Sequence, residues 1–166
     1  MIKKVQQWFP LIILVTSIVV AVMAFLPGLA KDDTSFTGLK LVFGGYGNMS
    51  IGGVTLGKDF GFSFVNFLAY FGPVVMAIIV AILGALDRNQ GVVKMVLAVV
   101  TAVLFVLSLV FIILLAKNSG TNTPLGTITL DEAGFKLAYG AIIALIFALV
   151  GTMASILYAA MQVMKR

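Results

Sequence analysis

The stretch MVLAVVTAVLFVLSLVFIILLA, residues Met95–Ala116, decides the class of this protein. It contains no charged residue, and almost every position is apolar. An uncharged apolar run of about 18 or more residues is long enough to cross the hydrocarbon core of a bilayer as a helix. The stretch therefore predicts a transmembrane helix.

Three further apolar runs share this character and lie at Trp8–Leu29, Phe62–Leu86 and Leu137–Met164. Over the 166 residues, 61% are hydrophobic and 10% are charged, and the mean hydropathy is +1.17. Soluble domains contain about 45–50% apolar and about 25% charged residues. We therefore predict an all-α membrane protein, a single membrane domain over residues 1–166 that forms a four-transmembrane-helix bundle. The first run has the order of a signal peptide, but it exceeds the about 7–15 residues of a signal core, so we expect a retained helix.

The charged residues are divided unevenly between the two sides of the predicted bundle. The N-terminus, the short turn at residues 87–94 and the C-terminus hold six cations and one acid, whereas the loops at residues 30–61 and 117–136 hold five of each. Because Lys and Arg collect in cytoplasmic loops, we predict a multi-pass protein of the cell membrane with both termini cytoplasmic. The cations lie in pairs and not in a stripe among exposed aromatics, so we expect contact with the lipid bilayer and no binding of nucleic acid.

The first outer loop contains a glycine-rich stretch with a strand-like rhythm, LVFGGYGNMSIGGVTLGKDFGFSF at residues 41–64. We predict a strand at Ser35–Phe43, a tight turn at Gly44–Asn48, where glycine tolerates positive φ, and a returning strand at Met49–Leu56. The β-branched run Gly126–Leu130 predicts another strand in the second outer loop. Together these segments predict a small extracellular antiparallel β cap of two or three strands. A phosphate-binding loop is disfavoured, because a strand and not a helix is expected after the glycines.

Aromatic residues crowd the outer entrance of the second predicted helix. They are Phe60, Phe62, Phe64, Phe67, Tyr70 and Phe71. One interpretation is an aromatic belt at the membrane interface together with packing under the cap. The other is an aromatic surface for a lipid or for a helix of a partner.

Polar groups are scarce inside the predicted helices. No Asp, Glu, Lys or Arg lies in the middle of any of them, which argues against ion-driven transport. Because the chain has no Cys and no His, we expect no enzyme, no catalytic residue, no cofactor and no metal site. Asn66 and Thr152 are the candidates for a polar contact within the membrane, either a hydrogen bond between elements or a contact with a solute. The other deep polar residues are Thr16, Ser17, Thr101, Ser108 and Ser155.

Small residues recur every three or four positions along the fourth predicted helix and form a small-residue stripe. The stripe comprises Gly140, Ala144, Ala148, Gly151, Ser155 and Ala159. Such stripes let helix backbones approach closely in membranes. They indicate either packing within this chain or a docking face for another copy or another membrane protein. Upstream, the residues from Thr129 to Glu132 fit a capping box, which predicts the start of this helix.

A family resemblance rests on the overall plan and on one short motif. The plan has four apolar runs, a long first outer loop and a shorter second one, and the motif is Gly38-Leu39 in the first outer loop. This plan resembles the claudin and peripheral-myelin-protein superfamily, and it is also similar to small four-helix membrane proteins of Gram-positive bacteria. The first resemblance implies a four-helix bundle with a stranded outer cap, and it implies junction formation or a paracellular pore. It transfers no site residue, because Lys40 stands where that family has a Trp and the two Cys of its loop are missing.

We therefore expect a non-enzymatic integral membrane protein that acts by association, as an accessory or assembly subunit or as a self-assembling tetraspan. Its partners would be a second copy or another membrane protein. The alternative is a channel or a passive transporter of small solutes, in which Asn66, Thr152 and Ser155 would line a path.

Overall fold

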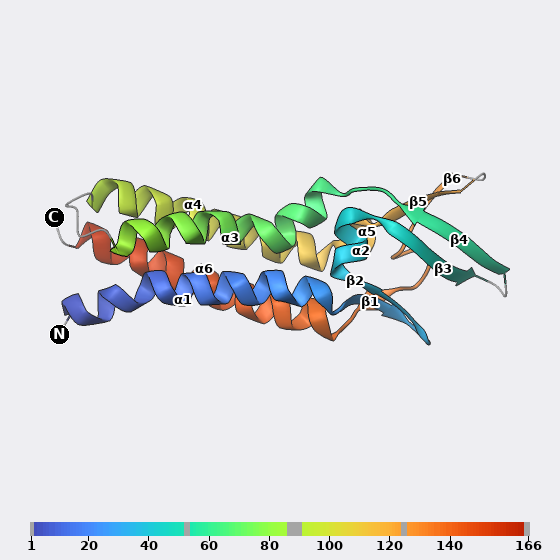
Figure 1. Cartoon of the computed structure of the whole chain (residues 1–166), viewed down its shortest axis with the longest axis horizontal. Coiled ribbons are helices and arrows are strands. Elements are labelled where there is room, and N and C mark those ends of the chain that lie inside the picture. The colour runs from blue at the N-terminus through green and yellow to red at the C-terminus, as the bar shows by residue number, and fades with distance from the viewer. Residues whose placement is uncertain (1, 52–53, 86–90, 124–125, 165–166) are drawn as a thin grey trace.

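Four long helices form the body of the molecule and lie side by side in Figure 1. The computed structural model describes residues 2–51, 54–85, 91–123 and 126–164. The long helices are α1 (Ile2–Val22), α3 (Phe64–Ala85), α4 (Gly91–Ile113) and α6 (Tyr139–Val163). Both α1 and α4 pack against α3 and α6, so each helix has two neighbours. All four are long and apolar enough to cross a membrane.

The strands gather at one end of these helices, which we call the strand end, and both termini lie at the opposite end (Figure 1). In the described part of the chain, short strands form three separate antiparallel sheets, ordered β2-β1-β7, β3-β4 and β5-β6. Their bounds are β1 Pro27–Lys31, β2 Thr34–Thr37, β3 Gly45–Ile51, β4 Val54–Phe60, β5 Gly120–Thr123, β6 Gly126–Thr129 and β7 Lys136–Leu137. The sheet β2-β1-β7 joins the segment after α1 to the segment before α6.

Each predicted apolar run overlaps one long helix, but boundaries at both ends differ from the prediction. Helix α1 begins at Ile2 and not at Trp8, and α4 begins at Gly91, within the predicted inner turn at residues 87–94. The first helix was expected to continue to Leu29, whereas α1 gives way to a 3₁₀ turn, η1 (Met23–Phe25), and then to β1. Pro27 begins that strand, because its ring and missing N–H do not fit a continuing helix. The third run divides into α4 and the short helix α5 (Leu115–Asn118).

The predicted strand at Ser35–Phe43 is wrong, because only its first residues belong to β2. The rest forms the short helix α2 (Gly38–Phe43). Thr37 caps this helix, since its side-chain oxygen accepts a hydrogen bond from the Lys40 backbone N–H at 3.4 Å. The helix ends at Gly44, whose φ of 86° suits glycine. A local cap and a glycine end thus override the alternating pattern of Leu and Phe.

The predicted turn at Gly44–Asn48 is also wrong, because residues from Gly45 onward belong to β3. This strand pairs with β4 from Gly45↔Phe60 to Ile51↔Val54, and residues 52–53 between them lie outside the described residues. The returning strand is therefore β4 and not the predicted Met49–Leu56, whose first residues belong to β3. The strand expected at Gly126–Leu130 is confirmed as β6. It pairs with β5, however, and does not extend a sheet of the first loop.

The capping box at residues 129–132 is present, but it does not begin the last long helix. The Thr129 N–H donates to Glu132 Oε2 at 2.8 Å, and the Glu132 N–H donates to Thr129 Oγ1 at 3.3 Å. A turn with Gly134 at a φ of 82° follows, and then β7. Helix α6 begins at Tyr139 without a side-chain cap. The reciprocal hydrogen bonds therefore close a turn of the second loop.

Candidate functional site

The small-residue stripe of α6 lies in the interior of the chain, with all six residues buried. A Cβ atom at Gly151 would lie 2.4 Å from the ring of Phe105 on α4, and one at Gly140 would lie 2.7 Å from the Pro27 carbonyl oxygen. Ala144, Ala148 and Ser155 are fully buried, and Ala159 is 8% exposed. The stripe therefore packs against α4 and against the segment after α1 of the same chain.

Most hydroxyl groups inside the long helices form hydrogen bonds with the backbone. The side-chain oxygens of Thr16, Ser17, Thr101 and Thr152 donate to carbonyls three or four residues earlier in the same helix. Ser108 of α4 donates across to the Ala69 carbonyl of α3. Ser155 Oγ is buried and has no partner among the described residues. These hydroxyls lie on α1, α4 and α6, and none of them lines the pocket at the strand end.

Asn66, near the start of α3, connects three elements of the strand end. It is fully buried. Its Nδ2 donates to the Leu41 carbonyl of α2 at 2.8 Å and to Ser119 Oγ, just after α5, at 3.0 Å. Its backbone N–H donates to Ser63 Oγ at 3.3 Å. The predicted polar residue is thus a connection between a long helix and both loops, whereas Thr152 bonds only within its own helix.

A partly open pocket of about 260 Å³ lies beside Asn66 and is lined by residues 61–63 and 118–120 together with Leu41. Three of these lining residues are the ones that Asn66 contacts, so Asn66 holds the pocket wall together. Within the described chain, two buried amide atoms here have no hydrogen-bond partner, Asn66 Oδ1 and Asn118 Nδ2. Unpartnered buried polar atoms are uncommon in folded proteins. We call this cavity the junction pocket.

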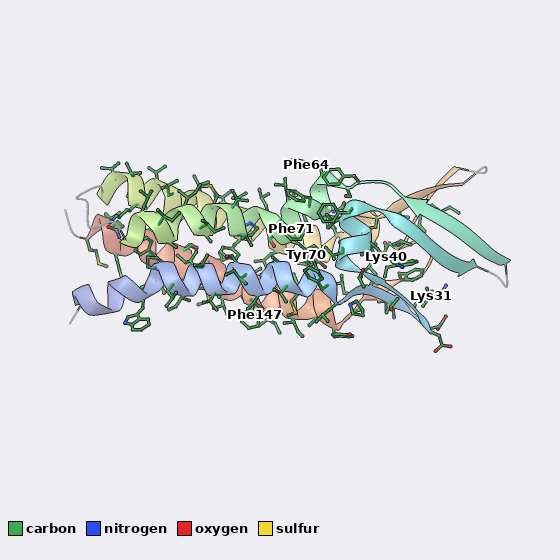
Figure 2. All side chains as sticks on the ribbon, in the orientation of Figure 1. Lys31, Lys40, Phe64, Tyr70, Phe71 and Phe147 are labelled. Carbon is green, nitrogen blue, oxygen red and sulfur yellow. The ribbon has the colours of Figure 1, made fainter. Side chains whose placement is uncertain are left out.

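A cluster of phenylalanine rings adjoins the junction pocket and shares Phe62 with it. Phe43 lies with its ring centroid 6.2 Å from Phe62, 6.2 Å from Phe67 and 6.0 Å from Phe71. Phe43 and Phe62 are more than half exposed, as is the nearby Phe64. Figure 2 shows Phe64 at the start of α3 and Phe71 further along the same helix. The strand end of α3 therefore presents an exposed aromatic surface.

The charged side chains that the structure describes at the strand end do not line the junction pocket. The Lys31 ammonium donates to the Ala133 carbonyl at 2.6 Å and so ties β1 to the turn before β7. The hydrogen bonds from Thr129 hold the pKa of the exposed Glu132 carboxyl below its ordinary value. In the described residues, no three His, Cys, Asp or Glu side chains come close enough together to hold a metal ion. The described residues that line the junction pocket offer uncharged hydrogen-bonding groups beside an aromatic surface.

The sequence pointed to Asn66 but not to Ser63, Asn118 or Ser119. These three residues are short polar residues at the ends of helices, a common pattern that carries no specific signal, and only the fold brings them together. Comparison of the chain with family models, with curated proteins and with solved structures finds no match. What can be argued about function therefore comes from the geometry of this chain.

Proposed function

We propose that this chain is a multi-pass protein of the cell membrane that acts by association and not by catalysis. In this proposal α1, α3, α4 and α6 span the bilayer as one bundle, the termini are cytoplasmic, and the strand end lies outside as a β cap. The protein serves as an accessory or assembly subunit, or it assembles with copies of itself. The likeness to claudins and peripheral myelin proteins enters only as a shared plan of helices and loops.

The outer surface of the helices supports the membrane placement. Large apolar side chains are exposed along all four helices. On the first span, Trp8 and Phe25 are each 62% exposed and mark the two ends of this surface. The helical rise puts them about 26 Å apart, close to the about 30 Å thickness of a hydrocarbon core. Net positive charge at the opposite end from the strands supports the orientation.

The observation that carries the association is the pair of two-stranded hairpins at the strand end. Figure 1 shows the β3–β4 hairpin extending well past the helices. Among the described strands, β3 pairs only with β4, and β5 pairs only with β6, so their outer edges are open. An isolated two-stranded hairpin is marginally stable in water, and open edges accept a further strand. Completion by a partner's chain or by a second copy accounts for both features.

The interior of the helices supports association over a channel. A path for solutes must replace water with polar groups that line a continuous cavity. Here the Phe105 ring fills the space beside Gly151, and the hydroxyl of Thr152 is bonded to the Ala148 carbonyl. We therefore expect liposomes that contain the purified protein to pass small solutes no faster than empty liposomes. Reproducible flux that disappears in Asn66→Leu would favour the channel instead.

The register of the hairpin allows a direct test of association. Gly47 pairs with Lys58, so residues 48–57 can be replaced by an Asn-Gly turn that shortens β3 and β4 together. A matched control replaces only residues 52–53 with Asn-Gly and keeps the full hairpin. Crosslinking in native membranes, followed by purification in mild detergent, should recover a complex from the wild type and the control but not from the shortened variant. A monomer in all three cases, or a complex that survives shortening, would contradict the proposal.

A further inference from the structure

The junction pocket has an unusual chemical character, since its polar groups are uncharged and mainly donors. No charged side chain lines it among the described residues. The hydroxyls of Ser63 and Ser119 each accept a hydrogen bond from Asn66, so each keeps its own proton to donate. Asn118 also lines the pocket, but its unpartnered Nδ2 is itself sealed from solvent. The group that fits is an uncharged moiety rich in acceptor oxygens, such as the hydroxyls of a sugar.

The surroundings of the pocket place this moiety on a lipid. Phe62 lines the pocket and also belongs to the exposed phenylalanine cluster with Phe43 and Phe67. An aromatic face packs well against apolar C–H groups, both of a sugar ring and of an acyl chain. A volume of about 260 Å³ is below the about 300–1,000 Å³ of pockets that enclose drug-sized ligands. It therefore suits a headgroup whose chains remain outside on the aromatic surface.

We infer that the junction pocket binds the glycosyl headgroup of a neutral glycolipid in the outer leaflet, with the lipid chains lying along Phe43, Phe62 and Phe67. Asn66 acts as a positioning residue, because it holds three residues of the wall. The inference rests on the membrane placement proposed above, but not on the association of the hairpins. It assigns a role to the aromatic surface.

Two substitutions can remove this site while leaving the fold intact. Gly61 lines the pocket, and a Cβ atom there would meet nothing within 4 Å, so Gly61→Leu adds bulk at a lining position without a clash at the Cβ atom. Asn118→Leu removes an amide whose Nδ2 forms no hydrogen bond in the described chain, so little stability should be lost. Gly91→Leu is a matched control, because Gly91 is equally open but lies at the start of α4, away from the strand end.

The experiment uses the full chain in phosphatidylcholine nanodiscs that contain a minor fraction of one test lipid with the same acyl chains. The test lipids are monoglucosyl diacylglycerol and phosphatidylglycerol, and a further arm adds free glucose to discs without either. Native mass spectrometry counts the lipids that stay bound to the protein. We expect monoglucosyl diacylglycerol to be enriched about tenfold over its bulk fraction, the ratio that two modest neutral hydrogen bonds supply. Free glucose should not bind, and Gly91→Leu should keep the enrichment.

The enrichment should fall to the bulk fraction in Gly61→Leu and in Asn118→Leu, with melting temperatures close to that of the wild type. Equal retention in all variants, or stronger retention of phosphatidylglycerol, would overturn the inference. Binding of free glucose at the same strength would show that the lipid chains play no part and would overturn it as well. Failure of the protein to enter the discs would instead refute the membrane placement, so the two failures can be told apart.

Discussion

Replacement of Gly151 by alanine tests whether the small-residue stripe is packed as tightly as the structure shows. The added Cβ atom would lie 2.4 Å from the ring of Phe105, which is itself fully buried. The matched variant is Gly72→Ala in α3, where the added Cβ meets its nearest side chain, Leu68, at an ordinary 3.6 Å. Both glycines lie inside long helices, so both substitutions gain the same helix propensity, about 0.8–1.0 kcal/mol.

The difference between the two variants therefore isolates the cost of displacing Phe105. Overpacking of a filled interior costs about 1–3 kcal/mol. We expect Gly72→Ala to be neutral or slightly stabilising and Gly151→Ala to be less stable than it by that amount. At about 2–4 °C per kcal/mol for a chain of this size, the melting temperatures in detergent should differ by several degrees. Thermal unfolding followed by far-UV circular dichroism measures this difference. Equal melting temperatures, or a more stable Gly151→Ala, would refute the packing of α6 against α4.

The remaining predictions concern orientation, the junction and the second loop. Because the chain has no Cys, single Cys residues can be introduced one at a time. A Cys at the exposed Ser35 should react with an impermeant maleimide in intact cells, and one at Met164 should not. The reverse pattern would show that the orientation is the opposite of the proposed one. Asn66→Leu leaves the polar groups that Asn66 satisfied without a partner and should destabilise the protein by about 2–3 kcal/mol, measured by thermal unfolding; no change would mean that its hydrogen bonds do not form. The lowered pKa of Glu132 stabilises the folded turn only while the carboxyl is ionised, so the protection factor of the Thr129 amide, which is its intrinsic exchange rate at each pH divided by its measured rate, should fall as the pH falls through the acidic range of that carboxyl. Glu132→Gln should remove this pH dependence, and its persistence in that variant would assign it to another group.

The sequence was sufficient for the long helices because their signal is local and continuous. No charged residue interrupts any of the apolar runs, so each helix can be recognised without knowledge of its tertiary contacts. The segment after Thr37 behaves differently, because Leu39, Leu41 and Phe43 alternate as in a strand, whereas a Thr cap and the close approach of Gly38 to Ala24 favour a short helix. A Thr that can cap a helix is common in loops, and the approach of Gly38 to Ala24 exists only in the folded chain.

The junction pocket could be predicted only in part, because its walls come from distant segments. Asn66 is conspicuous as an amide within an apolar run, and this made it a candidate from the sequence. Its partner Ser119 lies 53 positions away, beyond two long helices. Nothing in the residues around Ser119 indicates which polar group it will meet. Pairing of this kind depends on how α3, α2 and α5 are brought together, which periodicity does not reveal.

The sheet β2-β1-β7 has a consequence for the order in which the protein is built. Strand β1 is synthesised directly after α1 and can pair at once with β2, from Pro27↔Thr37 to Lys31↔Thr34. Its other edge is covered by β7, through Leu29↔Leu137 and Ala30↔Lys136, and β7 leaves the ribosome only after α3 and α4. A nascent chain thus carries an open strand edge until β7, just before its last long helix, has been made. When β7 pairs with that edge of β1, the segment that follows α1 becomes hydrogen-bonded to the segment that precedes α6.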